Sequence, residues 1–314
     1  MIAEIVLAVL LFIILNVFIS SYVGFCSACR RKRRAPNDER KHCGRSYSKE
    51  VAERLSAARL WMDAASSDPI CIQARDGLRL CGRVIPAEGE AKGIILLFHG
   101  LHSSCRRDLA IQAEELHRAG YHLVLPWHRS HGASEGKYHT FGATERWDVE
   151  RWCCFALERF GDLPIGLMGL SMGASTVLMS ANTGLPPQVK CIAGDCGFTD
   201  PWEITVHVLK HHRGLPPYPT IQMMNFWARL LAGFDYRECS AIESLKESSY
   251  PVLLIHGGKD NYVPTDMSRR IAAAFPDRVD LLIVENAHHG RAIHEDTDRY
   301  LETMLTFFNR HMEK

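Results

Sequence analysis

Residues 165–174 read IGLMGLSMGA, and this stretch decides the fold. A short apolar run leads into Gly169, Ser171 and Gly173, and small, helix-compatible residues follow, so the pattern predicts a buried strand, a tight turn and a helix. A serine at the tip of such a turn has a strained backbone, and its neighbours two positions away must be small. Its hydroxyl is exposed at a helix N-terminus, where free N–H groups can stabilise an oxyanion. The alternative is a chance Gly-x-Ser-x-Gly in an ordinary turn.

Predicted strands and helices alternate on both sides of this stretch. Asp76 and Gly77 indicate a hairpin turn, and continuous apolar runs after it are typical of strands buried on both faces of a parallel sheet. This order predicts an α/β fold with an open, mostly parallel sheet and helices on both faces. Further strands are expected at 70–74, 78–85, 93–98, 121–125, 189–193, 252–255 and 279–284, and helices at 106–119, 142–160, 265–275 and 298–310.

The N-terminal segment has the character of a membrane span. Residues 5–25 carry no charged side chain and would extend about 31 Å as a helix, which matches the hydrocarbon core of a bilayer. Five basic residues follow at 30–34, whereas Glu4 is the one charged side chain before the run. A secretory signal has the opposite charge order, so we expect an uncleaved transmembrane helix over 1–29, with a signal peptide or a buried helix as alternatives. The positive-inside rule then predicts a single-pass protein of the cell membrane, with everything after the basic run on the cytoplasmic side.

The remaining chain divides into a connecting segment and one large domain. Residues 30–66 are expected to form a basic tether and an amphipathic helix at 48–65. The α/β domain is expected over 67–314. Within it, three prolines separate two helical pieces rich in Trp, Met and Phe at 201–234. We expect a small helical cap at about 201–235, whose adaptable side chains suit apolar ligands, with plain core packing as the alternative.

Composition narrows the choice of partners and cofactors. The formal net charge of +1 gives no indication of nucleic-acid binding. Of eleven cysteines, Cys71, Cys81 and Cys191 lie in apolar runs, and we interpret most as reduced, buried small side chains, which implies a reducing compartment. Cys26 and Cys29 form a CxxC without a second pair at zinc spacing, so no metal and no other cofactor is expected.

Three residues that can carry chemistry follow predicted strands, in the order Ser171, Asp260 and His289. The carboxyl ends of parallel strands share one edge of a sheet, so these side chains can meet there. A serine hydroxyl is a poor nucleophile that needs a base, and the base needs a carboxylate to fix its tautomer. Two rivals remain open: His288 is adjacent to His289, and Asp195 also ends a predicted strand.

The combined motifs resemble the α/β-hydrolase superfamily over residues 70–308. The segment 256–264, HGGKDNYVP, resembles the family's acid loop, and 286–290, NAHHG, its histidine loop. Arg129 and His131 resemble parts of its D-x-R-G-H-G-x-S loop, although Trp127 and Ser130 stand where that loop usually has Asp and Gly. The sequence GLSMGA and the segment 195–200 are similar, more narrowly, to serine aminopeptidase-like or lysophospholipase-like bacterial hydrolases.

The resemblance implies a role for each candidate residue. Ser171 would be the nucleophile, Asp260 the orienting acid and His289 the general base, because the family pattern is Ala-x-His. The backbone N–H groups of Leu101 and Met172 would form the oxyanion hole. His99 and His256, each followed by a glycine, are expected to be structural and not catalytic.

These expectations combine into a membrane-anchored serine hydrolase that cleaves acyl or lipid-like carboxylic esters through an acyl-enzyme. The same residues would cleave thioesters or peptides. An aminopeptidase would need acidic residues near the cap, where 201–234 offers only Glu203 and Asp235 follows it. A non-catalytic, tethered binding module is the remaining alternative, and the complete Ser, Asp and His set disfavours it.

Overall fold

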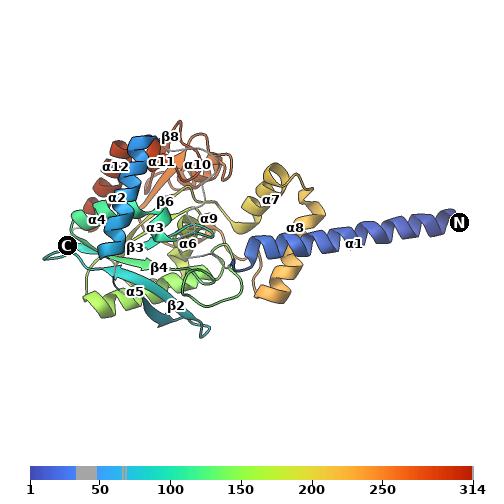
Figure 1. The fold of residues 1–314 in the computed structure, drawn as a ribbon, viewed down its shortest axis with the longest axis horizontal. Coiled ribbons are helices and arrows are strands. Elements are labelled where there is room, and N and C mark those ends of the chain that lie inside the picture. Colours follow the sequence, from blue (N-terminus) through green and yellow to red (C-terminus); the bar gives the residue numbers. More distant parts are fainter. Residues whose placement is uncertain (33–47, 66, 68, 313–314) are drawn as a thin grey trace.

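An eight-stranded, mostly parallel sheet forms the centre of the molecule (Figure 1). The computed structural model describes residues 1–32, 48–65, 67 and 69–312. The strand order is β1-β2-β4-β3-β5-β6-β7-β8; the β1–β2 and β2–β4 pairs are antiparallel, and the other neighbours are parallel. The predicted fold class is confirmed. The strands are β1 (Ile70–Gln73), β2 (Arg79–Ile85), β3 (Gly93–Phe98), β4 (Tyr121–Pro126), β5 (Ile165–Leu170), β6 (Val189–Asp195), β7 (Val252–Gly257) and β8 (Val279–Val284).

Helices cover both faces of the sheet, which is why the central strands β3, β5 and β7 are buried along their whole length. One face packs against α2 (Lys49–Ala65), α4 (Ala110–Arg118) and α12 (Thr297–Met312). The other face packs against α5 (Glu145–Phe160), α6 (Met172–Met179), α9 (Ala241–Lys246) and α10 (Thr265–Ala274). The short helices α3 (Cys105–Asp108) and α11 (Ala292–Glu295) complete the layers.

The predicted single helix at 106–119 is two helices, α3 and α4. The break falls at Leu109, whose backbone leaves the helical region at φ −131° and ψ 18°. Just before it, the Asp108 side chain turns away to accept hydrogen bonds from the loop after β3. The interruption therefore stabilises that loop, and helical periodicity does not reveal it.

Two of the cysteines predicted to be reduced are joined in a disulfide. Cys71 on β1 and Cys81 on β2 are direct cross-strand partners, so the hairpin register brings their side chains together. The expectation of reduced thiols is wrong for this pair. Eight other cysteines in the described part of the chain are free, and six of them are buried.

The cap consists of two helices inserted after β6. Helix α7 (Pro201–His212) begins with a proline in its first turn, and the Asp200 side chain accepts a hydrogen bond from the Glu203 N–H at 2.8 Å. Helix α8 (Pro217–Trp227) follows the proline-rich turn and continues into one π-helical turn that ends at Gly233. The prolines thus separate two helical pieces, as the sequence predicts.

The N-terminal helix α1 (Ile2–Cys29) is long and apolar enough to cross a membrane. Its first half extends away from the domain, and its second half lies beside α8 (Figure 1). The rings of Phe18 and Tyr22 contact Trp227 of α8, with centroid distances of 4.6 and 5.1 Å. Helix α1 is therefore part of the folded body at its carboxyl end.

The chain just after α1 is bound to the domain as well. The Arg31 backbone N–H donates to the Lys137 carbonyl at 2.8 Å, and its guanidinium donates to the carbonyls of Gly132 and Ser134. Here the chain differs from the tether predicted to start at residue 30. The rest of that predicted tether, 33–47, lies outside the described residues.

Candidate active site

Ser171 occupies the sharp turn between β5 and α6. Its backbone adopts φ 55° and ψ −116°, a conformation that L-residues rarely take. A Cβ on Gly173 would lie 2.1 Å from the Phe98 carbonyl oxygen, and one on Gly169 would lie 2.2 Å from the Gly173 backbone. Both positions therefore require glycine, because the strand and the helix approach each other across the turn.

The structure brings the three candidate residues into one hydrogen-bonded chain. His289 Nε2 lies 2.9 Å from Ser171 Oγ, and His289 Nδ1 lies 2.7 Å from Asp260 Oδ2. The three side chains come from the ends of β5, β7 and β8, which share one edge of the sheet. With Nδ1 donating to the carboxylate, Nε2 is free to accept the hydroxyl proton.

Both carboxylate oxygens of Asp260 have hydrogen-bonding partners. Its Oδ1 accepts the backbone N–H groups of Tyr262 and Val263, both at 2.9 Å, and its Oδ2 lies 3.2 Å from His256 Nε2. Burial alone would raise the pKa of Asp260, but the hydrogen bonds from His256 and His289 hold the pKa well below its usual value. The carboxylate is therefore ionised at pH 7.

The two rival residues lie elsewhere in the network. His289 makes both hydrogen bonds of the chain, and its neighbour His288 makes neither of them. Asp195 Oδ2 accepts the hydroxyl of Tyr300 at 2.9 Å, and the Asp195 carbonyl accepts the Ser171 N–H at 2.7 Å. Burial raises the pKa of Asp195 to about 6, while the Tyr300 hydrogen bond opposes the shift. Asp195 thus stabilises the turn at Ser171 through its backbone carbonyl and is not part of the Ser171–His289–Asp260 chain.

The backbone N–H groups proposed as oxyanion donors belong to residues that line the same cavity as Ser171. Leu101 follows β3, and Met172 begins α6. The N–H groups on either side of Leu101 are fixed by side chains: Gly100 donates to Asp108 Oδ2 at 2.8 Å, and His102 donates to His131 Nε2 at 2.9 Å. These two hydrogen bonds hold the loop on both sides of Leu101, so the backbone N–H of Leu101 is oriented before any substrate binds.

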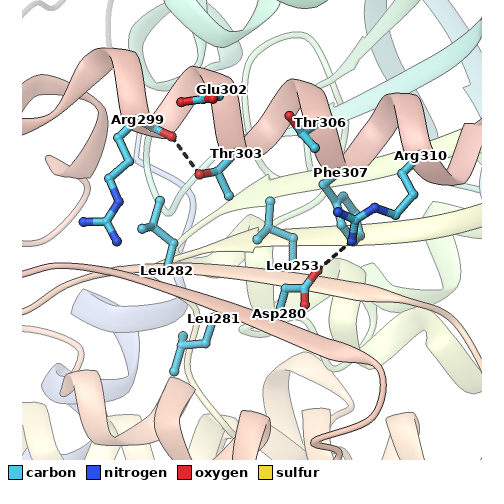
Figure 2. A pocket seen from close by; sticks show the side chains of 10 residues that line it. All are labelled: Leu253, Asp280, Leu281, Leu282, Arg299, Glu302, Thr303, Thr306, Phe307 and Arg310. Atoms are coloured by element: carbon cyan, nitrogen blue, oxygen red, sulfur yellow. Dashed lines mark hydrogen bonds and ion pairs between the residues drawn. The ribbon is translucent and has the colours of Figure 1, made fainter.

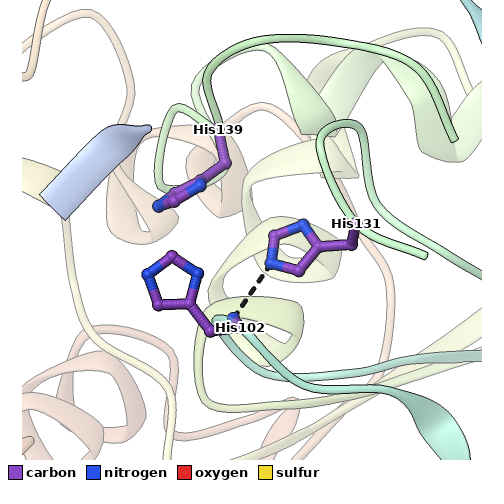
Figure 3. A group of neighbouring side chains, drawn as sticks. All are labelled: His102, His131 and His139. Atoms are coloured by element: carbon purple, nitrogen blue, oxygen red, sulfur yellow. Dashed lines mark hydrogen bonds between the residues drawn. The ribbon is translucent and has the colours of Figure 1, made fainter. Parts of the chain in front are cut away.

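A cluster of histidines lies beside this loop. Figure 3 shows His102, His131 and His139, whose ligand-capable atoms all lie within 4.8 Å of one another. His131 uses both ring nitrogens, because Nδ1 donates to the Arg129 carbonyl while Nε2 accepts the His102 N–H. Burial lowers the pKa of His131 well below its usual value and that of His139 to about 4, so both rings are neutral at pH 7. A metal would need His131 to release the loop, so we assign this ring to loop positioning.

The loop that contains Arg129 shows how serine is accommodated at position 130, where the family pattern has glycine. Ser130 replaces the usual glycine yet adopts a positive φ of 65°, and its Oγ donates to the Tyr138 carbonyl at 2.7 Å. Arg129 forms a buried, bidentate ion pair with Asp148 at 2.7 and 2.8 Å and a second pair with Asp76 at 2.7 Å. The side-chain bonds of Ser130 and Arg129 thus fix the loop that carries His131.

A cavity of about 460 Å³ opens directly over Ser171. Its walls come from the loop after β3 that carries Leu101 and His102 (the oxyanion loop), from the cap and, unexpectedly, from helix α1. Most of the lining side chains are apolar, among them Phe141, Phe198, Val208 and Met224. The volume and character are those of a small-molecule site. A second hollow of about 400 Å³ lies between β8 and α12, is lined in part by the ion pair of Arg310 and Asp280, and contains none of the three candidate residues (Figure 2).

Two family models match this chain. The model described as serine aminopeptidase, S33, matches residues 89–203, and the prolyl oligopeptidase family model matches residues 161–314. The Ser171 turn lies in their overlap, and Asp260 and His289 lie within the second. The chain belongs to the α/β-hydrolase superfamily.

This α/β hydrolase has relatives in bacteria and structural neighbours in archaea. It is 27% identical over 191 residues to the uncharacterised protein YqkD of Bacillus subtilis, a match that covers 60% of this chain and 63% of YqkD, less than two thirds of that relative. The Pyrococcus furiosus esterase Pf2001 superposes with a TM-score of 0.65 at 22% identity, covering 80% of this chain and 93% of the esterase. A Pyrococcus horikoshii acylaminoacyl peptidase superposes with a TM-score of 0.59 at 19% identity, covering 81% and 43%. The solved structures that share this fold thus include both an esterase and a peptidase.

Sequence reasoning missed several residues that position this site. Asp108 and the ring of His131 hold the oxyanion loop, and His256 contacts Asp260 as well as the loop backbone. The motif around His131 was visible, but its hydrogen-bond partner lies 29 residues earlier in the chain. The contribution of α1 to the cavity has no local signal, because apolar and small residues are expected in any membrane helix.

Proposed function

We propose that this hydrolase cleaves acyl esters through a Ser171–His289–Asp260 triad, and that α1 anchors it in the cell membrane. The observation that carries the proposal is the hydrogen-bonded chain from Ser171 Oγ through His289 to Asp260 Oδ2, which opens into an apolar cavity. This arrangement matches the geometric requirement for an activated serine nucleophile.

The reaction follows from the positions of these atoms. Ser171 Oγ attacks the ester carbonyl carbon while its proton passes to His289 Nε2. The carbonyl oxygen becomes an oxyanion that accepts the N–H groups of Leu101 and Met172. When the C–O bond breaks, His289 returns the proton to the departing alcohol. Water then attacks the acyl-enzyme with His289 again as base, which releases the carboxylic acid and restores the Ser171 hydroxyl.

The composition of the cavity favours esters over peptides with a free amino terminus. Among the described residues that line it, none is Asp or Glu, whereas Lys32 and Arg213 are cationic. A substrate ammonium group would find no carboxylate there, and its desolvation would be uncompensated. An acyl chain, by contrast, gains from burial against apolar walls by roughly 0.8 kcal/mol per methylene.

Helix α1 is proposed to remain on the mature protein. Cleavage after it would remove one wall of the cavity and the hydrogen bond between Cys29 Sγ and the Tyr236 hydroxyl, which are 3.0 Å apart. The basic residues 30–34 favour a cytoplasmic domain. Protease added outside intact cells should leave the domain whole; digestion of the domain would place it outside, as the Cys71–Cys81 disulfide would then also suggest.

Turnover of p-nitrophenyl butanoate by the full-length protein in detergent tests the ester proposal. Ser171→Ala should abolish it, while Ser180→Ala should leave it unchanged, because the Ser180 hydroxyl donates to the Val177 carbonyl at the end of α6 and takes no part in the triad. Equal turnover by the Ser171 variant would refute the triad. Faster cleavage of aminoacyl p-nitroanilides than of the ester would replace the esterase assignment with a peptidase.

A further inference from the structure

Helix α1 forms part of the substrate-binding cavity. Five of its residues line the space above Ser171, namely Ser20, Val23, Gly24, Ser27 and Ala28. Their spacing of three, four, seven and eight residues places them on one face of the helix. The adjacent face, with Ser21, Phe25 and Cys29, is buried against the domain. An anchor that served only for attachment would not need a second face turned to the active site.

The carboxyl end of α1 lies nearest the oxyanion loop. The His139 ring donates to the Ala28 carbonyl, and its centroid lies 4.7 Å from that of His102, which follows the proposed oxyanion donor Leu101. Ser20 lies two turns earlier, about 12 Å along the axis from Ala28. Positions along α1 therefore correspond to depths in the cavity, with Ser27 closer to Ser171 and Ser20 farther away.

The cap carries an exposed apolar patch beside this helix. Apart from Met1 and α1, seven large hydrophobic side chains of the described residues are exposed, and five of them lie in the cap segment 215–231. Leu215 belongs to both the patch and the cavity lining, so the cavity meets the surface there. The five are Leu215, Tyr218, Phe226, Leu230 and Leu231.

The length of α1 indicates what covers this patch. A hydrocarbon core of about 30 Å takes up about 20 helical residues, so a bilayer entered at Ile2 extends to about residue 21. That depth coincides with the contacts of Phe18 and Tyr22 on Trp227, and aromatic rings are typical of the membrane boundary. The cap then lies in the interfacial layer, with its apolar patch on the leaflet.

We propose that α1 is a wall of the acyl-binding site and that the substrate is a lipid ester that reaches Ser171 laterally from the adjoining leaflet. The inference rests on the proposed esterase function. It adds the source of the substrate and the helix face that limits the length of its acyl chain. The acyl chain lies between α1 and the cap, and its ester carbonyl reaches the triad.

Adjacent tryptophan substitutions on α1 test the wall, with the full-length protein in lipid nanodiscs. Ser20→Trp fills the cavity face, whereas Ile19→Trp, at a position that is 53% exposed and outside the cavity, adds the same bulk at the same membrane depth. The measurement is the ratio of kcat/KM for p-nitrophenyl hexadecanoate to that for the butanoate. Ser20→Trp should lower the ratio about tenfold or more, and Ile19→Trp should leave it within about twofold.

A third variant tests whether position along α1 corresponds to depth in the cavity. Ser27→Trp should exclude octanoate as well as hexadecanoate, since position 27 lies closer to Ser171, and covalent labelling of Ser171 by a fluorophosphonate shows that each variant is folded. Equal ratios for the Ser20 and Ile19 variants would overturn the inference while leaving the esterase proposal intact. Absence of Ser171-dependent butanoate turnover in the wild type would overturn both.

Entry of the substrate from the leaflet can be tested separately. Protein reconstituted in vesicles should hydrolyse a hexadecanoyl ester lipid placed in its own bilayer at least about tenfold faster than the same lipid in separate vesicles, because only the former reaches the cavity through the leaflet. Equal rates would show that the substrate arrives through water and would overturn entry from the leaflet.

Discussion

Replacing Asp260 with Asn should reduce turnover by about 10⁴-fold, or about 5.5 kcal/mol in the activation free energy, without unfolding the protein. Asp260 Oδ1 accepts two backbone N–H groups at 2.9 Å, and an asparagine oxygen would keep these bonds. The amide nitrogen must then face His289 Nδ1, which lies 2.7 Å from Oδ2 in the native protein. His289 Nδ1 would have to accept, so Nε2 would carry the proton.

A protonated Nε2 donates to Ser171 Oγ and cannot take its proton, so the geometry survives while the base is lost. The matched control is Asp195→Asn, which changes the rival carboxylate and should alter kcat by less than about tenfold, because Asp195 bonds to Tyr300 and not to His289. The assay is kcat/KM on p-nitrophenyl butanoate, with thermal unfolding as the check on folding. Equal losses in the two variants, or a loss below about tenfold for Asp260→Asn, would refute the reasoning.

Three further predictions concern the surroundings of the triad. Arg129→Met should lower the free energy of unfolding by about 3–5 kcal/mol in denaturant titrations, because it leaves Asp148 buried without its bidentate partner. Asp108→Ala should reduce kcat by about 10- to 100-fold with little change in KM, since the Gly100 N–H loses its acceptor and the oxyanion loop loosens. Asp195→Asn should raise the Tm at pH 8, and the gain should disappear as the pH falls through about 6 toward 3.8, because burial raises the pKa of Asp195 to about 6 and the folded protein favours its neutral form.

Each of these has a comparison variant or a contradicting outcome. Arg75→Ala removes an exposed pair with Glu150 and should lower the free energy of unfolding by at most about 1 kcal/mol. A similarly small loss for Arg129→Met would mean that the buried pair contributes no more to stability than the exposed one. Asp63→Ala, which removes an exposed partner of Arg106, should not affect kcat. A Tm difference for the Asp195 variant that is constant from pH 4 to 8 would contradict a raised pKa.

The sequence was sufficient for the sheet and for the neighbours of Ser171. Long apolar strands and Gly-x-Ser-x-Gly have local physical causes, namely burial on both faces and the close approach of Gly173 to Phe98. Predicted strand ends agree with the structure to within two residues, as at β3 and β8. Local pattern is informative wherever the structure depends on neighbouring residues.

The sequence was insufficient where contacts join distant segments. The break at Leu109 exists because Asp108 serves a loop eight residues earlier, and the Cys71–Cys81 disulfide depends on hairpin register. The docking of α1 on Trp227 joins segments about two hundred residues apart. Hydropathy identified α1 as a candidate membrane helix, but the same apolar composition concealed the face that lines the cavity.

The most direct test of the catalytic assignment is the site of covalent modification by a fluorophosphonate in the full-length protein. Peptide mapping by mass spectrometry should find one adduct, on Ser171, which His289→Ala slows by about three orders of magnitude or more. An adduct on another serine, or labelling of Ser171 at an unchanged rate in the His289 variant, would contradict the account.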